Sequence, residues 1–159
     1  MRNRHLMVVL CGITAAAPAA AQAGKHACAL LSAAEIKQLT GNDKVARSAG
    51  KPEESRFSSN CMYEGAIDIT IHIGSQTKVM FGRQRDTYAK APARLNYKVE
   101  SVSGLGEGAY TLSYSGKMEA RAMVGETELV VSLSGSLPPE AEARKMAVAL
   151  TKAAEAKLK

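Results

Sequence analysis

The sequence predicts an α+β domain in which an antiparallel sheet of about five to six strands has helices packed on one face. Three observations support this fold class. Residues 66–73 alternate strictly between isoleucine and other residues. Four further short runs alternate in the same way, and glycine-containing segments separate them. Segments with helical signals lie around residue 35, before residue 90 and at the C-terminus. The predicted order is α-β-β-α-β-β-β-β-α.

The first 23 residues are typical of a secretory signal peptide. Two arginines precede an uncharged run over 6–21, and small residues lead up to Ala23. We expect cleavage after Ala23, which leaves one domain over residues 24–159 in the periplasm or outside the cell. A transmembrane anchor is the alternative, because a bilayer needs about 20 apolar residues. The many alanines and Pro18 in the run argue against an anchor.

The charge of the chain falls once this segment is removed. The formal net charge is +6 over 159 residues, but the remaining 136 residues keep 19 of the 21 basic residues and all 15 acidic residues, a net of +4. A basic protein can bind nucleic acid, yet export argues against that partner. The chain also has no Trp and only seven Phe and Tyr residues, which leaves few rings for stacking on bases or sugars.

Two cysteines remain after cleavage, Cys28 and Cys61, and an even number in an exported chain predicts a disulfide. A redox pair is the first alternative, but its usual spacing is C-x-x-C. A metal site at His26-Ala27-Cys28 is the second, but the sequence has no other Cys/His pair at ligand spacing. We therefore expect a structural disulfide and neither metal nor cofactor.

The first half of the domain contains one helix and two strands. Ser32 and Glu35 form a capping-box pattern for a helix over 32–40, and Gly41 is placed to end it. The polar stretch 42–56 predicts a loop. Two strands follow, over 57–63 and 66–73. In the second strand, four isoleucines face one side and are predicted to be buried: Ile67, Ile69, Ile71 and Ile73.

The second half predicts a helix, four strands and a final helix. The first helix covers about 76–90 and ends at Pro92. The strands are Tyr97–Val102, Ala109–Tyr114, Lys117–Val124 and Thr127–Leu133. Two-residue turns at Ser115-Gly116 and Gly125-Glu126 predict hairpins. Ser136 is expected to cap the C-terminal helix, whose apolar positions include Met146 and Leu150.

Candidate catalytic groups are few. Asp68 and His72 share a strand face but lie about 13 Å apart at 3.3 Å per residue, so they cannot bond directly. An ordinary polar strand face is the favoured interpretation, and a hydrolase-like site around His72 is the alternative. The glycine-rich segment 104–108 resembles a phosphate-binding loop, but such a loop must open a helix. Here an alternating strand follows, which favours a flexible connection.

One basic segment could contact an anionic surface. Between residues 78 and 98, six cations face a single acid, Asp86, which gives a local net charge of +5. These candidate contact residues are Lys78, Arg83, Arg85, Lys90, Arg94 and Lys98. The possible partners are an envelope protein, a polysaccharide or anionic lipid headgroups. A solvated helix face is the alternative without a partner.

Several short motifs resemble a group of small bacterial exported domains, many of them actinobacterial lipoproteins. The matching residues are Cys28-Ala29-Leu30-Leu31-Ser32-Ala33-Ala34-Glu35 with Gly41, Cys61-Met62-Tyr63, and Gly104-Leu105-Gly106-Glu107-Gly108-Ala109-Tyr110. The resemblance implies an α+β domain similar to the PsbP-like sandwich, with the two cysteines paired, and supplies no catalytic residue. The chain departs from the group in having no lipobox cysteine.

The sequence therefore predicts an exported binding or accessory protein without catalytic activity. A small hydrolase using His72 and an envelope-surface protein using the segment 78–98 are the two alternatives.

Overall fold

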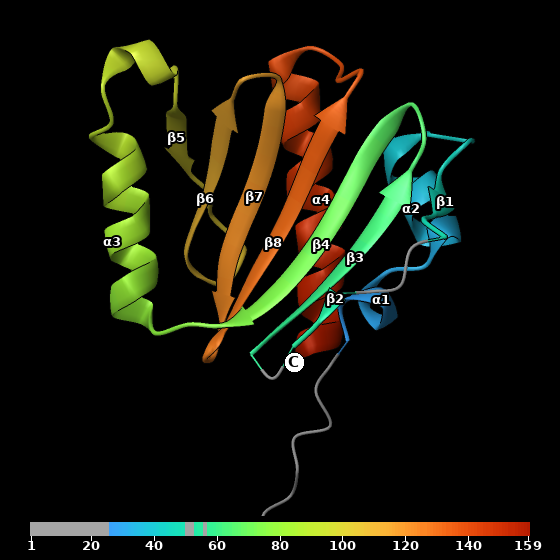
Figure 1. Ribbon diagram of the computed structural model, residues 1–159, viewed down its shortest axis with the longest axis horizontal. Coiled ribbons are helices and arrows are strands. Elements are labelled where there is room, and N and C mark those ends of the chain that lie inside the picture. The colour runs from blue at the N-terminus through green and yellow to red at the C-terminus, as the bar shows by residue number, and fades with distance from the viewer. Residues whose placement is uncertain (1–25, 50–52, 56) are drawn as a thin grey trace, which may run out of the picture.

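The computed structural model describes residues 26–49, 53–55 and 57–159. Within these residues, eight strands form one sheet with antiparallel pairing throughout. The strands are β1 (Ala46–Arg47), β2 (Glu53–Glu54), β3 (Ser58–Glu64), β4 (Ile67–Ser75), β5 (Lys98–Ser101), β6 (Glu107–Tyr114), β7 (Lys117–Val124) and β8 (Thr127–Gly135). Their order across the sheet is β1-β3-β4-β8-β7-β6-β5, and β2 also pairs with β3 (Figure 1).

Four α-helices and one 3-10 helix accompany the sheet in the described residues. They are α1 (Ala27–Leu30), α2 (Ala33–Thr40), α3 (Lys78–Ala89), η1 (Ala93–Leu95) and α4 (Glu140–Leu158). The predicted signal peptide over 1–23 lies outside the described residues.

The predicted fold class is wrong in strand number, in element order and in the placement of the helices. The sheet has eight strands rather than five to six, and a short helix precedes the predicted first one. The two added strands are β1 and β2, both within the stretch predicted as a loop. Each has two residues and both are exposed, so no alternation of apolar residues marks them. They form only because β3 offers an unpaired edge.

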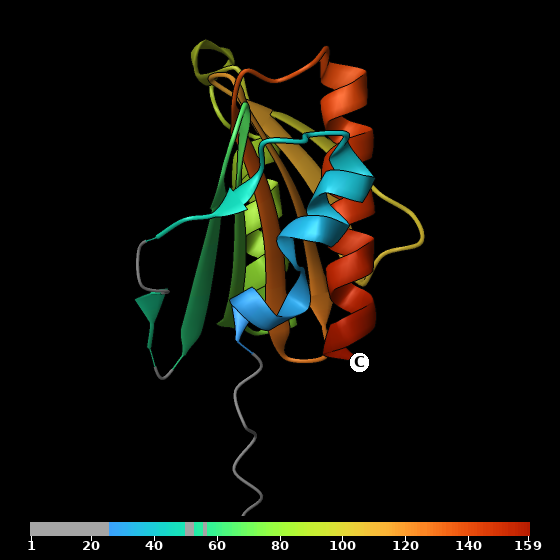
Figure 2. The ribbon, with the colours of Figure 1, turned by 90° about the vertical axis from the view of Figure 1, so that its right-hand side faces the viewer.

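The main core lies between the sheet and α4. The isoleucines of β4 pack here as predicted, since Ile69 and Ile71 are fully buried. Figure 2 shows α4 along this face of the sheet, with α1 and α2 on the same side. Helix α4 buries small side chains toward the sheet, including Ala147 and Ala154. Small residues let the helix approach the strands closely, and Leu150 fills the space between them.

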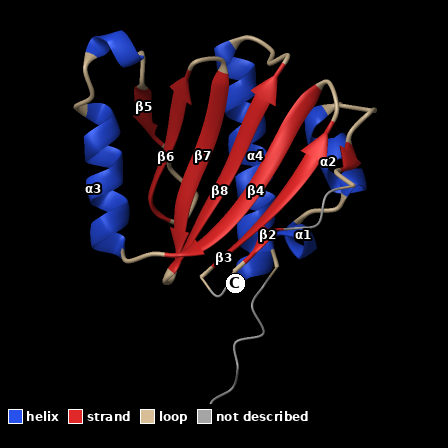
Figure 3. Ribbon diagram, viewed as in Figure 1, coloured by secondary structure: helices blue, strands red, loops and turns tan. Residues whose placement is uncertain are grey.

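A second, smaller core lies on the other face, beneath α3. Phe81 of α3 packs against Tyr110 of β6 with ring centroids 5.3 Å apart, and Leu112 and Met123 complete the cluster. The next residue in β6, Thr111, points to the opposite face of the sheet. There its hydroxyl accepts a hydrogen bond from Arg144 of α4. Helices therefore cover both faces, with α3 beside the β5–β6 end of the sheet (Figure 3).

Local signals for caps and turns are mostly confirmed. Ser32 and Glu35 form the predicted capping box on α2, and Gly41 ends this helix with φ +66°. A hydrogen bond from Lys157 and bonds from Ser32 lower the pKa of Glu35 to about 2. The helix cap predicted at Ser136 is wrong, because α4 begins after Pro139. Consecutive prolines hold the preceding backbone extended, so the helix cannot start earlier.

Candidate functional site

The face of the sheet beneath α3 carries a buried ion-pair cluster formed by Glu119, Arg121 and Glu128, called here the Arg121 cluster. Arg121 donates from Nε to Oε2 of Glu119 at 2.8 Å and from Nη1 to Oε1 of Glu128 at 3.1 Å. The side chains of Arg121, Glu119 and Glu128 are 12%, 7% and 10% exposed. One guanidinium therefore bridges carboxylates from β7 and β8 inside the fold.

Neighbouring polar groups complete the hydrogen bonding of the Arg121 cluster. Tyr114 donates to Oε1 of Glu119 at 2.8 Å, and Gln76 donates to Oε2 of Glu128 at 2.9 Å. Each of the four carboxylate oxygens thus accepts a bond, which is the condition for burying ionised groups at tolerable cost. The ring of Tyr88 in α3 lies 5.7 Å from the Arg121 guanidinium carbon. The cluster therefore ties α3 to the middle of the sheet.

Arg121 and two tyrosines near it have raised pKa values. Burial lowers the pKa of Arg121, but the charge of Glu119 and its other neighbours outweighs burial and raises it. Burial and the bond to Glu119 raise the pKa of Tyr114. Burial raises the pKa of Tyr110 to about 12. Raised pKa values keep Arg121 charged and the two tyrosines neutral at pH 7, so these three groups act in the cluster as hydrogen-bond and ion-pair partners.

Sequence analysis did not identify this cluster, although a signal for it exists. Glu119 and Arg121 alternate with Ala120 and Ala122 along one strand. Opposite charges two residues apart lie on the same strand face and can pair there. Ala120 and Ala122 are buried, but the sequence does not show that the opposite, charged face of the strand is covered as well.

His72 is not assembled into a catalytic arrangement. Its Nδ1 lies 2.6 Å from the amide oxygen of Asn60, and the amide nitrogen of Asn60 donates to Glu53 at 3.2 Å. Burial lowers the pKa of His72, which favours the neutral ring. Asp68 is not its partner, since this carboxylate accepts the backbone N–H of Gly65 at 3.3 Å. A neutral amide cannot stabilise an imidazolium as a carboxylate does.

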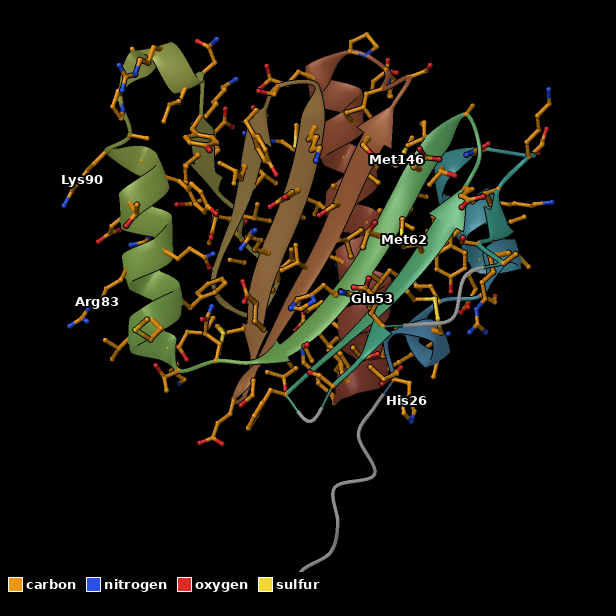
Figure 4. The ribbon with its side chains drawn as sticks, viewed as in Figure 1. His26, Glu53, Met62, Arg83, Lys90 and Met146 are labelled. Carbon is orange, nitrogen blue, oxygen red and sulfur yellow. A yellow bond between two sulfur atoms is a disulfide. The ribbon has the colours of Figure 1, made fainter. Side chains whose placement is uncertain are left out.

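The basic segment 78–98 divides into paired and unpaired cations. Lys78 pairs with Glu107, Arg85 with Asp86, and Lys98 with both Glu100 and Glu140. For the other three cations, no ion pair is found with any described residue: Arg83, Lys90 and Arg94. Figure 4 shows Arg83 and Lys90 pointing from α3 away from the sheet. Three of the six cations of this segment are therefore left without an ion-pair partner among the described residues.

The predicted disulfide is present between Cys28 of α1 and Cys61 of β3. Nearby polar contacts hold the same corner together. The backbone N–H of Ala27 donates to the hydroxyl of Ser59 at 2.9 Å, and His26 pairs with Glu54 at 2.9 Å between Nδ1 and Oε2. His26 therefore faces a carboxylate rather than Cys28.

The glycine-rich loop before β6 connects two strands and contacts α4. Its Gly106 N–H donates to Oε2 of Glu155 in α4 at 3.0 Å, and Glu155 is only 4% exposed. A strand follows the loop, as predicted from the sequence. The anion that this loop binds is thus a carboxylate of its own chain.

Replacing Gly106 by alanine should lower the free energy of unfolding by about 1–3 kcal/mol, because overpacking forces the backbone to shift. A Cβ atom there would lie 2.1 Å from the carbonyl oxygen of Met123. Urea unfolding provides the measurement. Gly82→Ala is the matched control, since a Cβ atom there meets no atom within 4 Å. Alanine is more favourable than glycine in a helix by about 1 kcal/mol, so this control should not lower the free energy of unfolding. Equal effects of the two substitutions would contradict the packing of this loop.

Neither a metal-binding cluster nor a membrane-spanning helix is found in the described part of the chain. Residues 26–49, 53–55 and 57–159 contain no group of three or more His, Cys, Asp or Glu side chains placed to hold a metal ion. Each helix in these residues is too short or too polar to cross a bilayer.

Comparison with known proteins identifies a similar fold. No protein-family model matches the chain, and no curated protein matches it either. Among solved structures, the extracellular domain of PknH from Mycobacterium tuberculosis is similar, with a TM-score of 0.50 and 12% sequence identity. The match covers 80% of this chain and 94% of that domain. At this identity the similarity shows that the two chains share a fold.

Proposed function

We propose that this protein is an exported domain, periplasmic or secreted after cleavage following Ala23, that binds a partner and has no catalytic activity. The observation that carries the proposal is the Cys28–Cys61 disulfide, because such bonds persist in oxidising compartments outside the cytoplasm. The signal-peptide pattern at the N-terminus supports export independently. The fold shared with an extracellular domain is in keeping with it.

The non-catalytic part of the proposal rests on how the ionisable side chains are used. The Arg121 cluster bonds internally, and His72 bonds to an uncharged amide. Glu155 accepts a bond from a backbone N–H. These groups have structural partners, so a role in binding through the surface fits better than acid–base catalysis.

We also propose that the chain belongs with the small bacterial exported domains that its motifs resemble. The motif cysteines pair with each other. Tyr63, from the Cys-x-Tyr motif, donates its hydroxyl to the carbonyl oxygen of Leu31 in the first motif. Gly106, from the third motif, is held against α4. The short motifs therefore stand at packed positions, which supports a structural origin for the resemblance.

Export is tested by expressing the full chain in a Gram-negative host and fractionating the cells. We expect the periplasmic fraction to contain a protein whose N-terminus is Gly24 and whose Cys28 and Cys61 peptides are disulfide-linked by mass spectrometry. A variant with Arg2 and Arg4 replaced by glutamate should stay in the cytoplasm, because the positive start is needed for export. A wild-type protein that keeps Met1 or carries free thiols would contradict the proposal.

The alternative of a hydrolase is tested separately with purified protein and chromogenic esters, phosphates and glycosides. We expect no turnover above that of buffer. Turnover that His72→Gln abolishes, while the protein keeps its unfolding midpoint, would establish the alternative instead.

A further inference from the structure

One exposed surface combines cations with apolar side chains. It consists of Val79, Met80, Arg83, Lys90, Arg94 and Leu95 from α3, the segment after it and η1, and is called here the α3 outer face. Val79, Met80 and Leu95 are 63%, 53% and 44% exposed. Isolated apolar residues are common on protein surfaces. Here, however, they lie among exposed cations.

The helix geometry places Val79, Arg83 and Lys90 opposite the packed side of α3. Phe81 is 3% exposed and contacts the sheet, and Tyr88, two turns later, also packs against it. Val79, Arg83 and Lys90 follow at spacings of four and seven residues, so they share the opposite side of the helix. The twelve residues of α3 span about 18 Å. Figure 4 shows Arg83 and Lys90 projecting outward along this helix.

The net charge of the α3 outer face is positive. Within the described residues, its three cations have no ion-pair partner. The one acid on this side of α3 is Asp86, which is neutralised by Arg85 at 3.1 Å between Nη2 and Oδ1. Lys78 and Lys98 flank the surface but pair with acids from other elements. An anionic partner would therefore meet three uncompensated positive charges.

We propose that the α3 outer face docks on the surface of an anionic phospholipid bilayer. A polyanion such as an acidic polysaccharide would use the cations alone and leave Val79, Met80 and Leu95 in water. The interface of a bilayer accepts both kinds of side chain, since apolar groups enter the headgroup boundary while cations bind the phosphates. The inference rests on the proposed binding function and specifies its partner, but its test does not depend on export.

The test is co-sedimentation of the disulfide-bonded protein with vesicles of phosphatidylcholine containing 30% phosphatidylglycerol, compared with pure phosphatidylcholine. We expect binding to the anionic vesicles only. Each cation near such a surface contributes about fivefold in partitioning. The variant Arg83→Glu/Lys90→Glu/Arg94→Glu should therefore bind at least about 100-fold more weakly. The variant Val79→Ser/Met80→Ser should lose the part of the binding that remains in high salt.

The matched control reverses three exposed lysines elsewhere, with the variant Lys37→Glu/Lys44→Glu/Lys152→Glu. The control variant has the same net charge as Arg83→Glu/Lys90→Glu/Arg94→Glu. If net charge alone governed vesicle binding, both variants would bind equally weakly. The proposal predicts instead that the control retains most of the binding. Equal losses would overturn the proposal. So would failure of the wild type to bind anionic vesicles, or binding to soluble polyglutamate in preference to vesicles. If the glutamate variant unfolds, Arg83→Gln/Lys90→Gln/Arg94→Gln tests the same charges.

Discussion

Replacing Arg121 by methionine is expected to lower the free energy of unfolding by about 3–5 kcal/mol. Arg121 pairs with Glu119 and Glu128, whose side chains are 7% and 10% exposed. Removing the cation leaves two ionised groups buried without a counter-charge, and this is the costly way to break a buried ion pair. The loss is a large share of the total stability of about 5–15 kcal/mol that a domain normally has.

Urea unfolding at pH 7 measures the effect of Arg121→Met. Arg83→Met is the matched control, because the same exchange on an exposed helix position should change stability by no more than about 0.5 kcal/mol. Similar values for the two variants would contradict the proposed role of Arg121.

A triple variant separates the loss of charge pairing from the loss of packing. Glu119→Leu/Arg121→Met/Glu128→Leu removes all three charges and keeps similar volumes. Replacing a whole buried ion-pair group in this way is often neutral or stabilising. We therefore expect the triple variant to be more stable than Arg121→Met alone. If it is equally unstable, the deficit arises from packing instead.

Removing the disulfide should lower the free energy of unfolding by about 3–4 kcal/mol. The bond closes a loop with a sequence separation of 33, and in the chain-entropy model this limits the conformations of the unfolded state by about that amount. The bond also anchors α1, a helix of four residues that has no side-chain cap. Such a short helix is not stable by itself, so it depends on this anchor and on packing.

The measurement is urea unfolding of Cys28→Ala/Cys61→Ala beside the wild type, with and without dithiothreitol. Dithiothreitol should lower the urea midpoint of the wild type to nearly that of the double variant and leave the midpoint of the double variant unchanged. This result would show that the reductant acts through the Cys28–Cys61 bond. A double variant that unfolds at the urea concentration of the oxidised wild type would refute the prediction.

These two stabilising features act on different strands of the sheet. The disulfide holds α1 to β3, and the Arg121 cluster, through Gln76 and Tyr88, connects α3 and the segment before it to β7 and β8. Helix α3 is therefore fixed on its inner side while its outer side stays exposed. A rigid helix presents its side chains in one arrangement, so docking through the α3 outer face does not have to order the helix first.

Features that depend on near neighbours in the chain could be predicted from the sequence. The alternation of Ile67, Ile69, Ile71 and Ile73 predicts a strand with one buried face, and β4 has that pattern. Ser32 and Glu35 are three residues apart and form the predicted capping box. Ser115-Gly116 and Gly125-Glu126 are tight turns with positive φ at Ser115, Gly116 and Gly125. The disulfide followed from the number of cysteines in an exported chain.

The sequence by itself determined the main strands, the two caps of α2, the hairpin turns and the cysteine pairing, because each depends on local backbone preferences or on a count. Only the tertiary structure decided which charges are neutralised. Lys78 meets Glu107, Lys98 meets Glu140, and Arg121 meets Glu128. These partners are brought together by strand register and by the crossing of α3 and α4 over opposite faces. The residues free to contact a partner are therefore those whose charges the fold leaves unpaired.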